Sequence, residues 1–192
     1  MKKVCVYCAS SRQIDPAFLD SARELGKIFA QNDIAIVYGG GSVGSMGALA
    51  EGALSEGGTV IGIIPDFMMK LEWGNNNITE LIVVNDMQER RKKLIEGTEA
   101  VVALPGATGT MEELFEALTW KRLGFYLNPI ILVNTRNFFD PLVKFFENCI
   151  AEKFMDERHR ALWSVVSEPS EVISAIDSAP PWHEDAVHFA SI

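Results

Sequence analysis

The sequence predicts an α/β protein built on a single doubly wound parallel sheet of six to seven strands, with helices on both faces. Short apolar runs alternate with segments of helical periodicity from one end of the chain to the other. The runs are continuous rather than alternately polar, which is typical of strands that helices cover on both faces. With 192 residues, 48% of them hydrophobic, the chain suits one domain with a sizeable core.

The first half of the chain supplies four of the predicted strands. An apolar run at Lys3–Tyr7 predicts the first strand and is too short for the core of a signal peptide. Pro16–Gln31 follows as an amphipathic helix, because its apolar side chains recur on one side. The elements after it are a strand at Ile34–Tyr38, a small-residue helix at Val43–Ser55, strands at Thr59–Ile64 and Leu81–Val84, and a charged helix at Met87–Glu96.

The second half continues the alternation, which makes the expected fold Rossmann-like. The predicted elements are strand Ala100–Leu104, helix Thr110–Leu123, strand Ile130–Val133, helix Asp140–Glu152, a short strand at Val165–Val166 and a helix at Pro169–Ile176. We expect the catalytic domain to span residues 1–179 and residues 180–192 to form a tail, which either docks on a neighbour or frays. The long connection Asp66–Glu80 is a candidate lid over a functional site.

The overall composition limits the possible partners. The net charge is −9, whereas a general nucleic-acid-binding surface usually gives a basic balance, so we expect no nucleic-acid partner. No apolar run reaches ~18 residues, so no membrane partner is expected either. Three cysteines do not make a disulfide framework, which favours a cytoplasmic location.

Cysteine and histidine patterns give little support for metal or redox chemistry. Cys5 and Cys8 form C-x-x-C within the first strand, where residues three apart face opposite sides. Two buried small side chains are therefore the better interpretation. The histidines His159, His183 and His188 lie far from the glycine-rich loops, and we expect them to be exposed to solvent. We expect no metal and no cofactor.

The segment Pro105–Glu113, PGATGTMEE, is the strongest functional signal. It follows a buried strand and opens a helix, so free backbone N–H groups and the positive end of the helix dipole meet at one place. Such a place favours an anion such as phosphate. Glu113 is expected in the first turn, where the dipole favours its ionised form. Read without context, Glu112 and Glu113 could equally be ordinary acids at a helix start.

A second glycine loop, Tyr38–Gly47, follows the second predicted strand. It contains G-x-G-x-x-G, which in isolation indicates dinucleotide binding, with Asp66 as a ribose ligand. Against that interpretation, the fingerprint normally follows the first strand of its unit. A purely structural alternative is that Gly44 and Gly47 allow close packing of a helix on the sheet. The dinucleotide interpretation also leaves the loop at Gly106 and Gly109 unexplained.

The segment Asp86–Leu94 adds the densest positive cluster of this acidic chain. It follows the fourth predicted strand and contains Arg90, Arg91, Lys92 and Lys93. A solvated basic face is the usual explanation for such a run. In a doubly wound sheet, however, this strand end lies beside the two glycine loops. An arginine there could clamp a phosphate or orient a carboxylate.

Together these motifs resemble those of the LOG (Lonely Guy) family, whose members are often labelled as lysine decarboxylases. The family pattern combines an M-H-E-R-K segment with the signature PGGxGTxxE, which correspond here to Met87–Arg91 and Pro105–Glu113. Further matches are Cys8–Ser11, Gly39–Gly41, Gly44, Met46, Gly47 and Thr119–Trp120. The resemblance covers about Val4 to Val133 and is looser beyond.

The resemblance implies a homodimeric phosphoribohydrolase that cleaves the N-glycosidic bond of cytokinin riboside 5′-monophosphates, and often of AMP. It implies Arg90 and Glu113 as the catalytic pair. The implied substrate contacts are Glu72, Arg91, Gly106, Ala107, Thr108, Gly109, Thr110, Met111, Glu112 and Thr119. The alternative on the same fold is a non-catalytic carrier of a nucleotide-like cofactor such as the molybdenum cofactor. The decarboxylase label lacks support, because no lysine stands in a setting suited to pyridoxal phosphate.

Several positions depart from the family pattern. Ala107 replaces the second signature glycine, and it would be strained if that position required a positive φ. Gln88 replaces the family histidine, Arg91 replaces a lysine, and Arg122 stands where a neutral residue is common. We expect such changes to alter base preference or activity while the fold stays intact.

Overall fold

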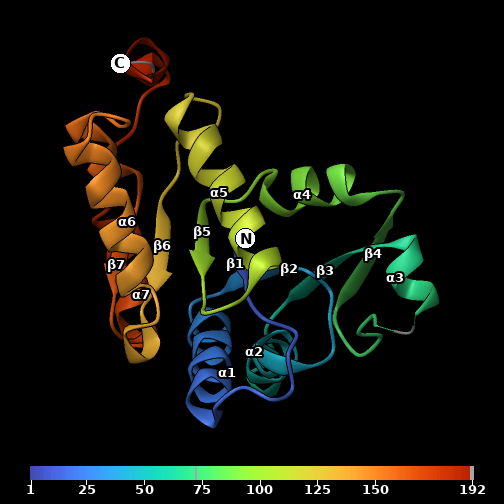
Figure 1. Cartoon of the computed structure of the whole chain (residues 1–192). Helices are drawn as coiled ribbons and strands as arrows, with labels where there is room; N and C mark the ends of the chain where they lie inside the picture. The colour runs from blue at the N-terminus through green and yellow to red at the C-terminus, as the bar shows by residue number, and fades with distance from the viewer. Residues whose placement is uncertain (72, 191–192) are drawn as a thin grey trace.

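The computed structural model describes residues 1–71 and 73–190. Its centre is an all-parallel sheet of seven strands, as the sequence predicts, and their order is β4-β3-β2-β1-β5-β6-β7 (Figure 1). The strands are β1 Lys2–Tyr7, β2 Ile34–Tyr38, β3 Val60–Pro65, β4 Glu80–Val84, β5 Ala100–Ala103, β6 Ile130–Val133 and β7 Ser164–Val166. Strands β2 to β4 lie on one side of β1, and strands β5 to β7 lie on the other. The strand order therefore reverses at β1, which is where a doubly wound sheet binds its ligands.

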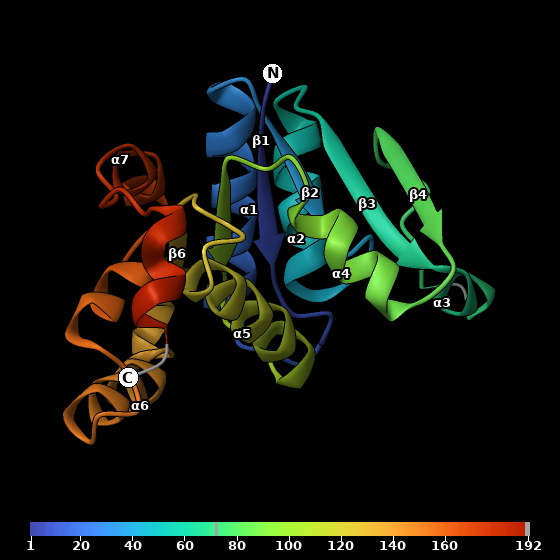
Figure 2. The ribbon, with the colours of Figure 1, turned by 90° about the horizontal axis from the view of Figure 1, so that it is seen from above.

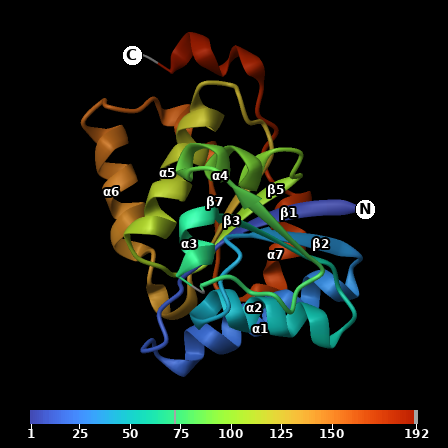
Figure 3. The same cartoon turned by 90° about the vertical axis from the view of Figure 1, so that its right-hand side faces the viewer.

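Helices cover both faces of the sheet. One face carries α1 Pro16–Gln31, α2 Gly44–Ser55 and α7 Val172–Asp177. The other carries α4 Met87–Ile95, α5 Thr108–Arg122 and α6 Asp140–Ala151. Figure 3 shows these two layers on opposite sides of the sheet, and Figure 2 shows α4 and α5 lying across it. Among the described residues, no helix is long and apolar enough to span a bilayer.

Alternation along β1 divides the core into two halves. Val4 and Val6 pack with α1 and α2, whereas Cys5 and Tyr7 pack with α4, α5 and α6. Cys8, just beyond the strand, belongs to the first half, so the two cysteines of C-x-x-C face opposite sides as predicted. Both thiols are buried and free, and burial raises the pKa of Cys8.

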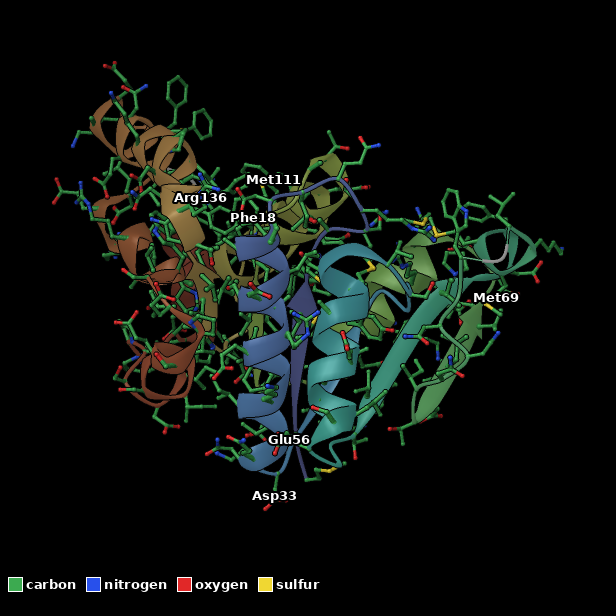
Figure 4. The ribbon with its side chains drawn as sticks, turned by 90° about the horizontal axis from the view of Figure 1, so that it is seen from below. Phe18, Asp33, Glu56, Met69, Met111 and Arg136 are labelled. Carbon is green, nitrogen blue, oxygen red and sulfur yellow. The ribbon has the colours of Figure 1, made fainter. Side chains whose placement is uncertain are left out.

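Helix α1 begins and packs for reasons that are visible in the sequence. Asp15 caps it by accepting a hydrogen bond from the Ala17 N–H at 3.0 Å, and Pro16 occupies the first turn. The helix buries one apolar side against α2, and Figure 4 shows the two helices side by side. Arg136, from a short 3₁₀ helix at Thr135–Asn137, forms an ion pair with the capping Asp15.

The structure corrects the prediction for the connection between β3 and β4. The segment is not an open loop, because helix α3 (Asp66–Lys70) follows β3 directly. Asp66 stands in its first turn and forms an ion pair with Lys70, an arrangement that suits the helix dipole. None of the five residues of α3 is buried.

The C-terminal region also differs from the prediction. Three further 3₁₀ helices lie at η2 Glu157–Leu162, η3 Pro169–Glu171 and η4 Glu184–Phe189. Up to Ala190 the segment neither frays nor extends away, because Trp182 and Ala186 pack into the core beside α5. His159 is fully buried beneath this segment rather than exposed, whereas His183 and His188 are exposed as expected.

Candidate active site

A cavity of about 360 Å³ lies at the carboxyl ends of the central strands. The loops after β1, β2 and β5 form its walls, and α3 and α4 close one side. Its lining includes Cys8, Ser10, Ser11, Gly39, Met46, Met68, Trp73, Met87, Arg90, Ala107, Thr108, Gly109, Thr110 and Glu113. Both predicted glycine loops and the predicted arginine therefore meet at one site.

The start of α5 forms the anion-binding part of this cavity. The helix begins at Thr108, two residues earlier than the sequence predicts, and its N-cap residue Ala107 forms no side-chain capping bond. Backbone N–H groups of the first turn have no partner within a helix, so here they are available to a ligand. Ala107 has φ −94°, so alanine replaces the family glycine without backbone strain.

Glycine is required at position 106 because the Thr110 side chain lies close to its backbone, and not because the position needs a positive φ. A Cβ at this position would lie 2.1 Å from Oγ1 and 2.6 Å from Cβ of Thr110. Thr110 is 4% exposed and lines the cavity, so its side chain has little room to move.

Replacing Gly106 by alanine is expected to displace Thr110 and to raise KM for a phosphorylated substrate about tenfold, the equivalent of one lost hydrogen bond. Steady-state kinetics with AMP measures the change. The contrasting variant is Gly109→Ala, because a Cβ there meets no atom within 4 Å. Equal effects of the two substitutions would contradict the steric explanation.

Arg90 extends from α4 to the ends of two strands. Its Nε donates to the Ile63 carbonyl at 3.2 Å, and its Nη2 donates to the Gly39 carbonyl at 3.1 Å. A Cβ at Gly39 would lie 2.4 Å from the same Nη2, so glycine at this position makes room for the guanidinium. Nη1 is left facing Glu113, 3.8 Å from Oε1, and both side chains are almost completely buried.

Glu113 is not the ionised first-turn acid that the sequence predicts. Because α5 begins at Thr108, no acidic residue lies in its first turn, and Glu113 belongs to the second. Burial raises its pKa to about 7, although the nearby Arg90 partly opposes the shift. The pKa of the carboxyl group is thus shifted toward neutral pH, which suits a group that accepts and returns a proton.

The other predicted substrate contacts fall outside the cavity of the single protomer. Arg91 is paired with Glu112, at 3.1 Å, and with Glu116, also at 3.1 Å. Met111 packs against the core, and Thr119 donates a hydrogen bond to the Phe115 carbonyl on the outer side of α5. Glu72 lies outside the described residues.

One wall of the cavity is made of residues that the sequence matched to family motifs or to the candidate lid without giving them a role in the site. Ser10 and Ser11 follow β1, while Met46, Met68 and Met87 contribute side chains from three other segments. The position of β1, where the strand order reverses, indicates a role for the β1 loop. The methionines carry no such positional signal, since an apolar side chain at a helix start usually belongs to the core.

Comparisons with known proteins agree with this geometry. A family model described as "Possible lysine decarboxylase" matches residues 46–176. The cytokinin riboside 5′-monophosphate phosphoribohydrolase LOG1 of Arabidopsis thaliana is 35% identical over 185 residues, which cover 95% of this chain and 86% of the relative. The chain belongs to the LOG family.

A bacterial LOG relative, the cytokinin riboside 5′-monophosphate phosphoribohydrolase of Rhodococcoides fascians, is 37% identical across 92% of this chain and 90% of its own length. The probable phosphoribohydrolase LOGL2 of Oryza sativa is 36% identical across 97% of this chain and 76% of its own length. These LOG relatives are named as phosphoribohydrolases, so the decarboxylase wording of the family model does not describe them.

Solved structures share the LOG fold at lower identity. The molybdenum cofactor carrier protein of Chlamydomonas reinhardtii is 24% identical, with a TM-score of 0.70 over 93% of this chain and 97% of its own. The molybdenum cofactor binding protein of Rippkaea orientalis, also 24% identical, gives a TM-score of 0.71 over 93% of this chain and 97% of its own. Within the described residues of the LOG chain, no three His, Cys, Asp or Glu side chains are grouped as a metal site.

Proposed function

We propose that the chain hydrolyses the N-glycosidic bond of N6-substituted adenosine 5′-monophosphates and of AMP, releasing the free base and ribose 5-phosphate. The observation that carries this proposal is the buried pair Arg90–Glu113 in the same cavity as the α5 N-terminus. One end of the cavity suits a phosphate, and the other presents a carboxyl group to the sugar. The names of the 33–39% identical relatives support the same reaction.

The reaction follows from the roles of these groups. Residues Gly106–Thr110 bind the 5′-phosphate, and this remote contact holds the ribose beside Glu113. As the bond from C1′ to the base nitrogen breaks, positive charge develops on the sugar, and the ionised Glu113 stabilises it. Glu113 also takes a proton from the attacking water, whose oxygen bonds to C1′. The departing base takes up a proton from solvent, and Glu113 then returns its own proton to solvent, so that the protons balance. Arg90 holds the carboxylate in position.

The raised pKa of Glu113 predicts how the rate depends on pH. The base is active when ionised, so kcat/KM should rise with pH and level off above about pH 7. Measuring kcat/KM for AMP between pH 5 and 9 tests this prediction. The substrate phosphate has its own ionisation near pKa ~6, so the profile is compared with that of Glu113→Gln, whose residual rate keeps the phosphate but lacks the carboxyl group. The same rise in both proteins would contradict the assignment.

A direct assay tests the function itself. Purified protein is incubated with AMP and with isopentenyl-AMP, and chromatography detects free adenine or N6-isopentenyladenine. Release of base is the expected result. Tight nucleotide binding without release would instead support a carrier, the function for which the Chlamydomonas protein is named. Preference for a dinucleotide over the monophosphates would support the NAD alternative.

We also propose that the protein is a homodimer in the cytoplasm, where its free cysteines stay reduced. The outer side of α5 and the neighbouring α6 form an apolar groove of about 220 Å³ that includes Phe115, Thr119 and Phe145. Large apolar patches of this kind are typical of interfaces. A second copy placed there would offer Thr119, which is remote from its own cavity, a route to the substrate of the neighbouring copy, as the family resemblance implies.

Replacing Phe115 by aspartate is expected to convert the dimer to a monomer, because the charge would be buried at the interface. Light scattering coupled to size-exclusion chromatography measures the mass. The matched control is Val83→Asp, at a comparably exposed apolar residue on the edge strand β4. A dimer that survives Phe115→Asp, or one that Val83→Asp disrupts instead, would contradict this placement.

A further inference from the structure

The C-terminal segment Trp182–Ala190, named here the C-terminal strap, lies across the end of α5 and beside η2 (Figure 1). The indole N–H of Trp182 donates to the Lys121 carbonyl at 2.6 Å, and Arg122 donates to the Ala190 carbonyl. The guanidinium of Arg158 lies 3.8 Å from the centre of the Phe189 ring. Each of these three contacts between the C-terminal strap and the rest of the protein therefore involves a side chain.

The strap's own backbone contributes little to its attachment. In the described part of the chain, its backbone–backbone hydrogen bonds outside regular helices run from Ala186 N to His183 O and from Ala190 N to Val187 O, within the strap itself. Its one described backbone bond to the rest of the protein is the one that the Ala190 carbonyl accepts from Arg122. It adds no strand to the sheet. The strap can therefore leave without breaking a β-ladder or a long helix, and its release exposes chiefly the apolar side chains of Trp182, Ala186 and Phe189.

His159 stands at the centre of the strap's contacts. It is 0% exposed, and its ring centre lies 5.5 Å from that of Phe189 and 6.3 Å from that of Trp182. Its Nδ1 accepts a hydrogen bond from the Asp156 N–H at 2.9 Å, so a neutral ring carries its proton on Nε2. Nε2 is buried and has no partner among the described atoms.

Charging this ring would be costly for two reasons. A second proton must go to Nδ1, where the Asp156 N–H already points, so two donors would face each other. Burial and the nearby Arg122 lower the pKa of His159, Arg158 lowers it further, and the Asp156 carboxylate opposes them. Lys121, almost fully buried one residue before Arg122, adds another cation to the same end of α5.

The charged groups of the strap itself do not compensate for these cations. They are His183, Glu184, Asp185 and His188, and all four are exposed to solvent. Exposed charges are screened by water and salt and contribute little to a buried ring.

We propose that the C-terminal strap is an acid-released element: a proton on His159 detaches Trp182–Ala190 while the sheet and its helices stay folded. The ring binds fewer protons when the strap is docked than when it is free. Docking is therefore complete above the usual histidine pKa of about 6.5 and is lost as the pH falls below that value. This inference is independent of the catalytic proposal.

Fluorine NMR of the full chain labelled with 5-fluorotryptophan tests the proposal. Trp73, Trp120, Trp163 and Trp182 report from separate places, and Trp182→Phe assigns the strap resonance. On titration from pH 7.5 to 4.5, the Trp182 resonance should change with a midpoint below 6.5, while that of the core residue Trp163 stays constant. Simultaneous change of all four resonances, or no change in this range, would overturn the proposal.

Three variants identify the titrating group. His159→Gln should abolish the transition, because glutamine can accept the Asp156 N–H bond but gains no charge. His188→Gln, the exposed histidine of the strap, should leave the midpoint unchanged. Asp156→Asn should raise the midpoint, because the docked ring then loses the carboxylate that stabilises its charge, and it provides a readout if His159→Gln does not fold. A transition unaltered in His159→Gln or Asp156→Asn, or abolished in His188→Gln, would overturn the role of His159.

Discussion

Replacing Glu113 by glutamine is expected to reduce kcat at least about 1,000-fold and, at the same time, to stabilise the fold at neutral and alkaline pH. Turnover is lost because the amide neither accepts the water proton nor carries the negative charge that stabilises the sugar. The free energy of unfolding rises because burial disfavours the ionised carboxylate, whereas glutamine carries no charge. Activity and stability therefore change in opposite directions at a single residue.

The size and the pH range of the stabilisation follow from the raised pKa. The carboxyl pKa rises from 4.5 to about 7 on folding, which corresponds to about 3 kcal/mol once the group is fully ionised. The folded state holds the proton more tightly, so wild-type stability declines as the pH rises through this interval. Glutamine does not ionise, so the variant does not lose stability in this way. The difference in free energy of unfolding between variant and wild type should be near zero below pH 4.5 and largest above pH 7.

Urea unfolding of both proteins at pH 4.5, 7 and 8.5 measures the difference, and base release measures turnover. Glu116→Gln is the matched control, because this carboxylate lies on the same helix but is paired with Arg91 and is partly exposed. It should retain activity and show no such pH-dependent gain. Full turnover in Glu113→Gln, or a variant less stable than wild type at pH 8.5, would contradict the role given to Glu113.

Replacing Arg90 by alanine is expected to have the second large effect, this time lowering both activity and stability. The change leaves the Ile63 and Gly39 carbonyls without their donor and removes the cation that faces Glu113. Loss of one member of a buried hydrogen-bonded set of this kind costs about 3–5 kcal/mol. Turnover should fall by about 1,000-fold, because the carboxylate loses its orientation and its ionised form becomes harder to reach.

Arg90→Lys separates charge from geometry. A lysine keeps the positive charge, but a single ammonium group does not reproduce the planar fork that reaches two carbonyls and a carboxylate together. We expect stability between those of wild type and alanine, with turnover still strongly reduced. Lys92→Ala, at an exposed residue of the same helix, should change neither. Arg90→Lys with wild-type kcat would show that the charge alone suffices.

The sequence predicted the sheet well because every strand is a short continuous apolar run. Strands of this kind are long enough to be recognised and have no competing helical period. The sequence placed Arg91 and Glu112 in the site beside Arg90 and Glu113. On a helix, however, neighbouring residues point about 100° apart, so one member of each pair faces the cavity and the other faces outward.

Other properties depend on contacts that no local pattern reveals. The ionisation of Glu113 depends on where α5 starts, and that start follows from the backbone of Ala107 rather than from a capping side chain. The burial of His159 depends on Trp182 and Phe189, which are more than twenty residues away in the sequence. Periodicity describes each segment separately, whereas burial and pKa depend on which segments meet.

The contact between Gly39 and Arg90 has a consequence for how this chain can diverge. A side chain at position 39 would occupy the space of the Arg90 guanidinium. A substitution there therefore displaces Arg90 from its position beside Glu113. Restoring arginine function would then require the glycine to return as well. The residues at positions 39 and 90 are therefore constrained together: after a change at position 39 alone a single reversion restores the contact, but once Arg90 has also been replaced both residues must revert.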